Sequence, residues 1–188
     1  MRFLVLGITG KRGSGKDTVA EYLKRKYGFH VLTYTEHVLS PILREQGKPV
    51  TRENLISLAL EMRKKGGKHV LTKLICDKIG KEGHWAISGV RYPEEHEYFR
   101  KRFGRDFKLL DIVCDARKRY ERILKRGTKG EGEMTFEEFM EIEKKETEKM
   151  IEQTEKLADF LLDNNGTMEE LYENVDILAK KLGISRSP

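Results

Sequence analysis

The sequence predicts one three-layer α/β domain, in which helices cover both faces of a central parallel sheet of about five strands. Short apolar runs alternate with helix-like segments along the chain, and strands separated by helices are typical of a parallel sheet. The first apolar run leads through a glycine-rich loop into a helix-like segment. A length of 188 residues with 38% hydrophobic residues suits one core. We therefore expect a single domain over residues 1–184 and a frayed tail at 185–188.

The expected strands are the apolar runs, and the expected helices are the longer segments between them. The strands cover residues 3–8, 29–33, 85–88, 109–114 and 160–162. The helices cover residues 17–27, 36–46, 52–79, 93–103, 116–126, 135–157 and 167–182. The pair Gly66-Gly67 breaks the third helix. Three threonines that precede acidic residues are the expected N-caps: Thr51, Thr135 and Thr167.

The loop after the first strand has the composition of a phosphate-binding loop. Its glycines let backbone N–H groups turn toward phosphate oxygens, and the following helix directs the positive end of its dipole to the same place. Lys16 adds a mobile positive charge for the β and γ phosphates. The alternative is a strand-to-helix turn without a ligand. The expected binding residues are Gly10, Lys11, Arg12, Gly13, Ser14, Gly15, Lys16, Asp17 and Thr18.

Asp17 departs from the usual loop pattern, because a serine or threonine hydroxyl normally meets Mg²⁺ at this position. Thr18 comes one residue late. The strand over 85–88 ends in Ser88, where many P-loop enzymes place the aspartate that positions Mg²⁺. We hypothesise that Asp17 supplies the missing carboxylate as a metal ligand. The alternative is that Asp17 only stabilises the positive end of the helix.

Composition and charge narrow the class of protein. The formal net charge is +6, which favours anionic ligands such as nucleotides and also permits nucleic acid. Cys76 and Cys114 lie beside aliphatic residues, so we expect small buried thiols rather than metal ligands or a disulfide. The sequence contains no long apolar run and no signal-peptide pattern. We expect a soluble cytoplasmic protein that has no membrane partner.

Three arginines are candidate catalytic residues. Arg122 and Arg126 are four residues apart on one expected helix, so they share a face from which two guanidinium groups could reach transition-state oxygens. The alternative is a solvated basic helix, since Lys118, Arg119 and Lys125 surround them. Arg91 follows the third strand, at the sheet edge where ligands bind in open α/β folds. Its alternative is a surface ion pair with a glutamate, Glu94 or Glu95.

Three polar segments complete the candidate site. The glycine-rich stretch within residues 126–140 joins two helices and is expected to form a lid, with a flexible linker as the alternative. Glu36 and His37, after the second strand, are candidates for a general base or simply start the next helix. The residues Asn164, Asn165 and Gly166 follow the last strand and suit a tight turn.

Five pieces of the chain, in this order, resemble the nucleotide-kinase-like P-loop phosphotransferases. They are the loop over 10–18, the segment 51–63, the segment 88–95 (Ser-Gly-Val-Arg-Tyr-Pro-Glu-Glu), the pair Arg122 and Arg126, and the segment 158–171. The similarity is greatest to the archaeal dephospho-CoA-kinase-like group, with kinship to phage-type deoxynucleoside monophosphate kinases and animal phosphomevalonate kinases. The resemblance implies a three-layer P-loop NTPase fold with a small helical lid.

The resemblance also implies roles for single residues. Lys16 would bridge the donor and the transferred phosphoryl, and Arg91 would face the acceptor. Arg122 and Arg126 would reach the phosphates when the lid closes, and Asn165 and Gly166 would lie near the nucleotide base. Archaeal relatives usually carry Gly-Asp after the second strand, whereas this chain has Tyr34-Thr35-Glu36-His37. The general base is therefore open.

We expect an ATP-dependent small-molecule kinase that transfers the γ-phosphoryl of Mg-ATP to a small anionic acceptor. Dephospho-CoA and nucleoside monophosphates fit the resemblance equally. A regulatory P-loop NTPase is one alternative, although the sequence contains no Asn-Lys-x-Asp guanine-reading motif. A nucleic-acid-associated ATPase is another, supported by the basic stretch 100–105, but we expect no nucleic-acid partner. The choice between ATP and GTP and the oligomeric state are open.

Overall fold

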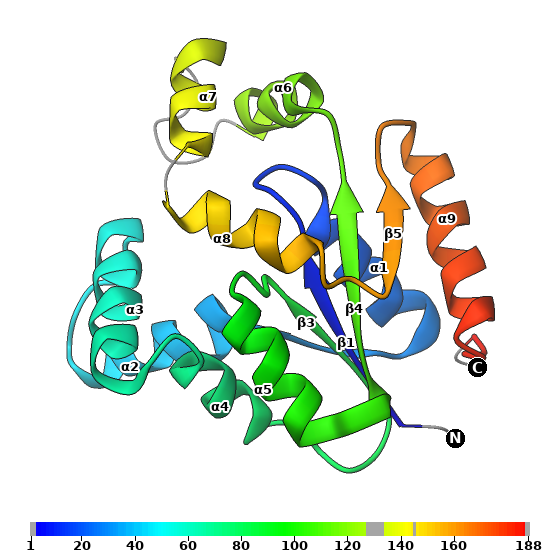
Figure 1. Cartoon of the computed structure of the whole chain (residues 1–188), viewed down its shortest axis with the longest axis horizontal. Helices are drawn as coiled ribbons and strands as arrows, with labels where there is room; N and C mark the ends of the chain where they lie inside the picture. Colours follow the sequence, from blue (N-terminus) through cyan, green and yellow to red (C-terminus); the bar gives the residue numbers. More distant parts are fainter. Residues whose placement is uncertain (1–2, 127–133, 145, 187–188) are drawn as a thin grey trace.

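Five parallel strands form the central sheet of the computed structural model, which describes residues 3–126, 134–144 and 146–186 (Figure 1). The strand order is β2-β3-β1-β4-β5, so β1 lies in the middle. This arrangement confirms the predicted three-layer α/β class, since helices cover both faces of the sheet. The strands are β1 (Leu4–Thr9), β2 (His30–Thr33), β3 (His84–Ser88), β4 (Phe107–Val113) and β5 (Phe160–Asp163).

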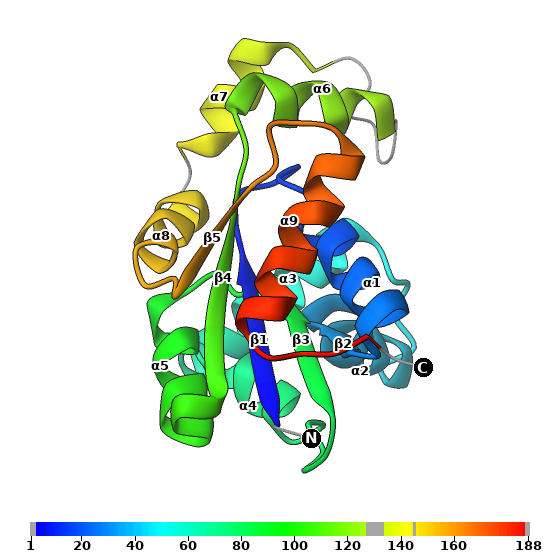
Figure 2. The same ribbon diagram turned by 90° about the vertical axis from the view of Figure 1, so that its right-hand side faces the viewer.

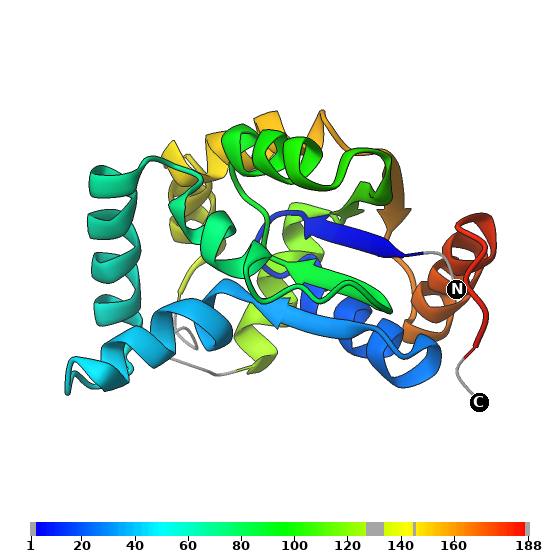
Figure 3. The ribbon, with the colours of Figure 1, turned by 90° about the horizontal axis from the view of Figure 1, so that it is seen from below.

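The helices of the described residues lie within or close to the segments that were predicted to be helical. A π-helical turn, Thr35–Leu39, leads into α2, and a 3₁₀ turn, Gly104–Asp106, leads into β4. Figure 3 shows α2 and α3 at the opposite side of the molecule from α9. The helices are α1 (Lys16–Tyr27), α2 (Ser40–Glu45), α3 (Arg52–Gly66), α4 (Val70–Cys76), α5 (Pro93–Phe103), α6 (Ala116–Arg126), α7 (Phe136–Glu143), α8 (Glu146–Glu155) and α9 (Met168–Lys181).

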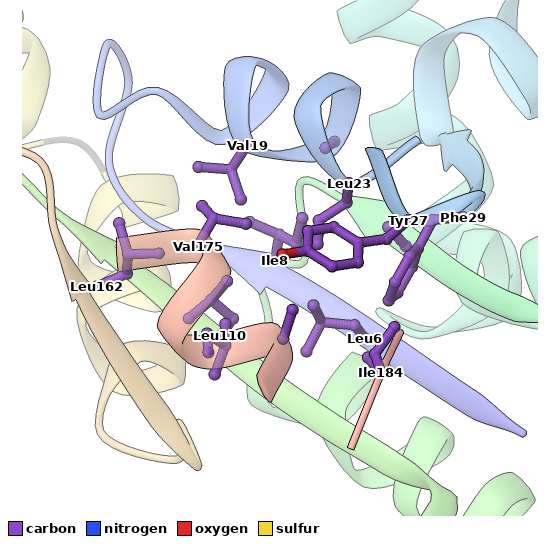
Figure 4. Packing of buried hydrophobic residues seen from close by; sticks show 14 of the residues in the cluster. Leu6, Ile8, Val19, Leu23, Tyr27, Phe29, Leu110, Leu162, Val175 and Ile184 are labelled. Atoms are coloured by element: carbon purple, nitrogen blue, oxygen red, sulfur yellow. The ribbon is translucent and has the colours of Figure 1, made fainter. Parts of the chain in front are cut away.

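The alternation of side chains along β1 divides the core into two layers. Leu6 and Ile8 point to one face, where they pack with residues of α1 and α9, among them Leu23 and Val175 (Figure 4). Val5 points to the other face, into a cluster with residues of α4 and α5. Burying one such aliphatic side chain contributes about 1.5–3 kcal/mol, so β1 is anchored from both faces. Its carboxyl end is therefore a fixed platform for the loop that follows.

The expected N-caps and the expected break at Gly66-Gly67 are present, whereas one further expected helix is divided. Thr51, Thr135 and Thr167 each accept a hydrogen bond from the backbone N–H three residues later, at 3.2 Å. The segment expected over 52–79 ends at Gly66 and resumes as α4, as predicted. The helix expected over 135–157 is instead divided near Lys144 into α7 and α8. Residues 127–133 of the expected lid, and residues 187–188 of the expected tail, lie outside the described residues.

Two further expectations concern thiols and membranes. Cys76 is buried and free, as expected, but Cys114 is only half-buried and lines a cavity beside the glycine-rich loop. Among the described residues, no helix combines the length and apolar character needed to cross a bilayer.

Candidate functional site

The glycine-rich loop connects β1 to α1 at the carboxyl edge of the sheet. Gly13 and Gly15 have φ angles of 80° and 104°, a backbone conformation that side chains rarely adopt. A Cβ on Gly13 would lie 2.9 Å from the backbone oxygen of Arg119 on α6, and a Cβ on Gly15 would clash with the side-chain amide of Asn164. The loop is therefore clamped between α6 and the β5–α9 turn (Figure 2).

Lys16, the first residue of α1, folds back over this loop. Its Nζ donates to the backbone oxygens of Gly10 at 2.6 Å and Lys11 at 2.9 Å. The ammonium group is thus half-buried against the loop, at a place where it could contact a phosphate.

Two buried hydroxyls at the loop have no hydrogen-bond partner among the described residues. They belong to Thr9 and Ser14. An unmade hydrogen bond of a buried polar group costs about 1–3 kcal/mol, so a ligand or water that supplies a partner would stabilise the loop. The groups that could hold the phosphates of a nucleotide are the Lys16 ammonium and the backbone N–H groups of the loop.

Asp17 and Ser88 are brought together across the β1–β3 boundary. The Ser88 hydroxyl donates to Oδ1 of Asp17 at 2.9 Å. Asp17 lies in the first turn of α1, where a negative charge is favourable. The carboxylate and the hydroxyl have exchanged positions relative to the usual P-loop arrangement, and their contact is retained.

Arg122 and Arg126 lie on α6, which packs above the loop. The Arg122 guanidinium donates to the Asn164 backbone oxygen at 2.9 Å and to Cys114 Sγ at 3.2 Å. Arg126 is exposed at the end of the helix. Only Arg122 is therefore linked to the loop, through the turn after β5.

Arg119, which belonged to the alternative of a solvated basic helix, is buried. Its guanidinium makes a bidentate ion pair with Glu143 of α7, with both N–O distances at 2.7 Å. It also donates to the backbone oxygens of Arg12 at 3.2 Å and Cys114 at 3.0 Å. One side chain thus joins α6, α7 and the glycine-rich loop. Its partner lies 24 residues away, and no local pattern marks such a pair.

Arg91 is exposed at the carboxyl end of β3, and the two glutamates of the alternative ion pair have other partners. Glu95 pairs with Arg63 of α3 at 3.3 Å, and Glu94 pairs with Lys68 at 3.0 Å. The Arg91 backbone is fixed instead, because its N–H donates to Glu95 at 2.9 Å and its oxygen accepts from Thr154 of α8 at 3.0 Å. The guanidinium is thus carried by a rigid backbone at the sheet edge.

Glu36 and His37 are tied to the turn after β2. Nδ1 of His37 accepts a hydrogen bond from the backbone N–H of Thr33 at 3.0 Å, and the Glu36 N–H donates to the Thr33 hydroxyl at 3.1 Å. The contact of His37 favours its role at the start of the next helical segment, whereas the contact of Glu36 uses only the backbone and leaves its carboxylate as a candidate base.

The residues of the β5–α9 turn contact the glycine-rich loop and the start of α6. Asn164 is buried and donates to the Ser14 backbone oxygen at 2.6 Å. Asn165 accepts from the Asp115 N–H at 2.8 Å, and Lys118 donates to its backbone oxygen. At Gly166 a Cβ would clash with the Glu170 carboxylate, which caps α9. The capping contact of Glu170 therefore accounts for the lack of a side chain at position 166.

Two carboxylates that the sequence reasoning missed lie beside the loop. Asp111 on β4 and Glu155 at the end of α8 line a cavity of 370 Å³. Burial raises the pKa of Asp111 to about 6. Burial, followed by the charge of Asp111, raises the pKa of Glu155 to about 7. The available signal was an aspartate inside the apolar run of β4.

The basic stretch over residues 100–105 is partly used by the fold. Both guanidinium–carboxylate contacts between Arg100 and Asp159 measure 2.6 Å, and Arg100 also donates to the Phe107 backbone oxygen at 2.7 Å. This residue therefore ties α5 to β4 and to the segment before β5.

Comparisons with known proteins agree with this geometry. A family model described as an AAA domain matches residues 6–151. The UPF0200 protein of Sulfurisphaera tokodaii is 36% identical over 180 residues, covering 95% of this chain and 97% of that protein. The shikimate kinase of Bacteroides thetaiotaomicron has a TM-score of 0.63 at 12% identity, covering 96% of this chain and 99% of that one. A gluconokinase of Sinorhizobium meliloti 1021 has a TM-score of 0.57 at 14% identity, covering 96% and 95%. The two structures show that the fold is that of P-loop kinases.

Proposed function

The chain belongs to the UPF0200 family and carries an AAA domain of P-loop kinase-like fold, and on this premise we propose that it is an ATP-dependent small-molecule kinase. The reaction would be transfer of the γ-phosphoryl of Mg-ATP to a small anionic acceptor. The observation that carries the proposal is the glycine-rich loop between β1 and α1, with Lys16 folded over it. Such a loop binds a polyphosphate through its backbone N–H groups and its lysine.

The loop residues would bind and orient the donor. Residues 10–18 would surround the β and γ phosphates, and Lys16 would exchange its contacts with the Gly10 and Lys11 oxygens for contacts with phosphate oxygens. Asn165 and Gly166 would border the nucleotide base, as the resemblance implies. Phosphoryl transfer depends mainly on positioning and on electrostatic stabilisation, and this loop supplies both.

Asp17 is the proposed protein ligand of Mg²⁺. Its carboxylate is a hard oxygen donor, which suits this cation, and the Ser88 hydroxyl orients it at 2.9 Å. When bound, the metal would neutralise charge on the phosphate oxygens. This proposal accounts for the lack of a carboxylate at the end of β3.

The arginines would stabilise charge on the transferred phosphoryl. Arg122 would have to exchange the Asn164 oxygen for a phosphate oxygen, and Arg126 would join it from the same helix face. Arg91 is exposed at the end of β3 and would bind the acceptor. A planar guanidinium is suited to an anionic acceptor such as a phosphate group.

The acceptor class is proposed from the resemblance to the phosphotransferases described above. Dephospho-CoA and nucleoside monophosphates are the two candidates. After β2 the His37 ring is engaged in the turn, whereas Glu36 is engaged only through its backbone N–H, so the Glu36 carboxylate stays the candidate general base for a hydroxyl acceptor.

The direct test is ATP consumption measured against a panel of acceptors: dephospho-CoA, ribonucleoside monophosphates and deoxyribonucleoside monophosphates. We expect one of these classes to accelerate ATP consumption and to yield a phosphorylated product. Lys16→Ala should abolish the effect, whereas Lys24→Ala, a change of an exposed lysine on the same helix, should preserve it. Hydrolysis that no acceptor accelerates, but that RNA or DNA stimulates, would contradict the proposal and favour a nucleic-acid-associated ATPase.

A further inference from the structure

A carboxylate on β4, that of Asp111, lies beside the start of the glycine-rich loop, and one of its oxygens has no hydrogen-bond partner among the described residues. Asp111 is 4% exposed, and this oxygen is Oδ1. Asp111 is aligned with Thr9, the last residue of β1, and a Cβ on Gly10 would lie 3.4 Å from that oxygen. The carboxylate therefore faces the first residue of the loop.

A second carboxylate faces the same cavity from α8. Glu155 is the last residue of this helix, and it lines the 370 Å³ cavity together with Asp111. The preceding residue, Thr154, is fully buried and donates to the backbone oxygen of Arg91 at 3.0 Å. This hydrogen bond fixes the end of α8 against the loop after β3, so Glu155 is presented by a restrained backbone.

The two basic side chains that line the cavity are already paired. Lys11 donates to Glu152 at 2.7 Å and lies 3.7 Å from Glu143. Arg119 makes its bidentate pair with Glu143. Other glutamates are therefore the nearest partners of these cations, although the charges of Lys11 and Arg119 also act on Glu155 and the charge of Lys16 acts on Asp111.

A polyphosphate in the loop would add further negative charge beside this pair. Like charges at close range disfavour one another, so a bound nucleotide favours a proton or a further cation between the carboxylates and the phosphates. Mg²⁺ is commonly held by one or two carboxylates while substrate phosphates complete its coordination. Such a site needs no third protein ligand, which agrees with the finding that the described residues contain no group of three or more metal-binding side chains.

We propose that Asp111 and Glu155 bind a divalent cation that bridges this carboxylate pair to the phosphate oxygens of the bound nucleotide. The site is distinct from Asp17, because Asp17 meets Ser88 on the β3 side of β1, whereas Asp111 lies on the β4 side. The inference rests on the proposed function, since the nucleotide supplies the remaining oxygens.

The test counts bound metal and bound nucleotide separately. Mn²⁺ serves as the probe and is counted by electron paramagnetic resonance, in the presence of a non-hydrolysable ATP analogue whose binding is measured by equilibrium dialysis. For the unmodified protein we expect two Mn²⁺ per bound nucleotide. Asp111→Asn and Glu155→Gln should each retain the nucleotide but weaken the second Mn²⁺ by about tenfold or more, because each removes one of two anionic ligands.

Glu121→Gln is the matched control, because this exposed carboxylate on α6 pairs with Arg117 one turn earlier and does not line the cavity. It should leave both Mn²⁺ in place. Asp111→Asn and Glu155→Gln keep the size of the original side chains. Thermal melting shows whether these variants fold. Nucleotide bound with a single Mn²⁺, or unchanged metal binding in both variants, would overturn this inference and leave the kinase proposal standing. Failure of the folded, unmodified protein to retain the nucleotide would overturn both.

Discussion

At the scale of single residues, Asp17 and Ser88 hold a carboxylate and a hydroxyl in exchanged positions. Asp17→Ser removes the carboxylate, and Ser88→Asp places a second carboxylate against the first. We expect each single change to raise the Mg²⁺ concentration for half-maximal ATP turnover by about tenfold. The double change should recover most of this loss, because it rebuilds the usual P-loop order. Unchanged Mg²⁺ dependence in Asp17→Ser would mean that Asp17 only stabilises the start of α1.

Also at this scale, Asp111 makes stability depend on pH in the metal-free protein. Burial raises the pKa of Asp111 from 3.8 to about 6. Between these values the folded state holds more protons than the unfolded state, so the free energy of unfolding falls as pH rises. Asp111→Asn should remove this fall and stabilise the protein by about 2 kcal/mol at about pH 8, with little gain at about pH 4.

Urea unfolding with a chelator present measures this difference between the variant and the unmodified protein. Glu121→Gln, at an exposed position, should change the free energy of unfolding by similar small amounts at both pH values. An equal effect of Asp111→Asn at the two pH values would show that the Asp111 carboxylate is not disfavoured in the folded state.

At the scale of elements, one ion pair holds α6 to α7 and to the loop. Glu143→Ala would leave the Arg119 guanidinium buried without its bidentate partner, and we expect it to lower the free energy of unfolding by about 3–5 kcal/mol. Replacing both residues, as Arg119→Met with Glu143→Leu, should cost less, because no buried charge is left. Glu121→Ala breaks the exposed pair with Arg117 and should cost about 1 kcal/mol or less. A similar cost for Glu143→Ala and Glu121→Ala, measured by urea unfolding, would contradict this role.

The same scale shows what local patterns could predict. The strands were located because a parallel sheet buries continuous apolar runs, and the three threonine caps were located because capping depends on neighbours three residues apart. The division between α7 and α8 was missed, because residues 135–157 keep a helical composition throughout. Their separation places Glu143 on Arg119 and Thr154 on Arg91, and such tertiary contacts leave no local mark.

At the scale of the whole molecule, the candidate site has two parts: a loop that is contiguous in the sequence, and side chains that the fold brings to it from distant segments. The loop could be predicted because strand, glycines, lysine and helix are contiguous in the chain. Asp111 and Glu155 come from separate elements, β4 and α8. They line one cavity only because the fold brings these elements together beside the loop. The burial of Arg119 could not be predicted for the same reason, since its partners lie in other segments. Local sequence therefore indicated the ligand class, whereas the charges around the ligand depend on topology.

The central claim is that the loop between β1 and α1 binds a nucleotide polyphosphate, and calorimetric titration with Mg-ATP tests it most directly. We expect one saturable site per chain, with affinity reduced about 100-fold or more in Lys16→Ala, because the variant removes the cation that meets the phosphates. Lys24→Ala should bind as the unmodified protein does. The absence of binding to the folded, unmodified protein, or equal binding by Lys16→Ala, would contradict the claim.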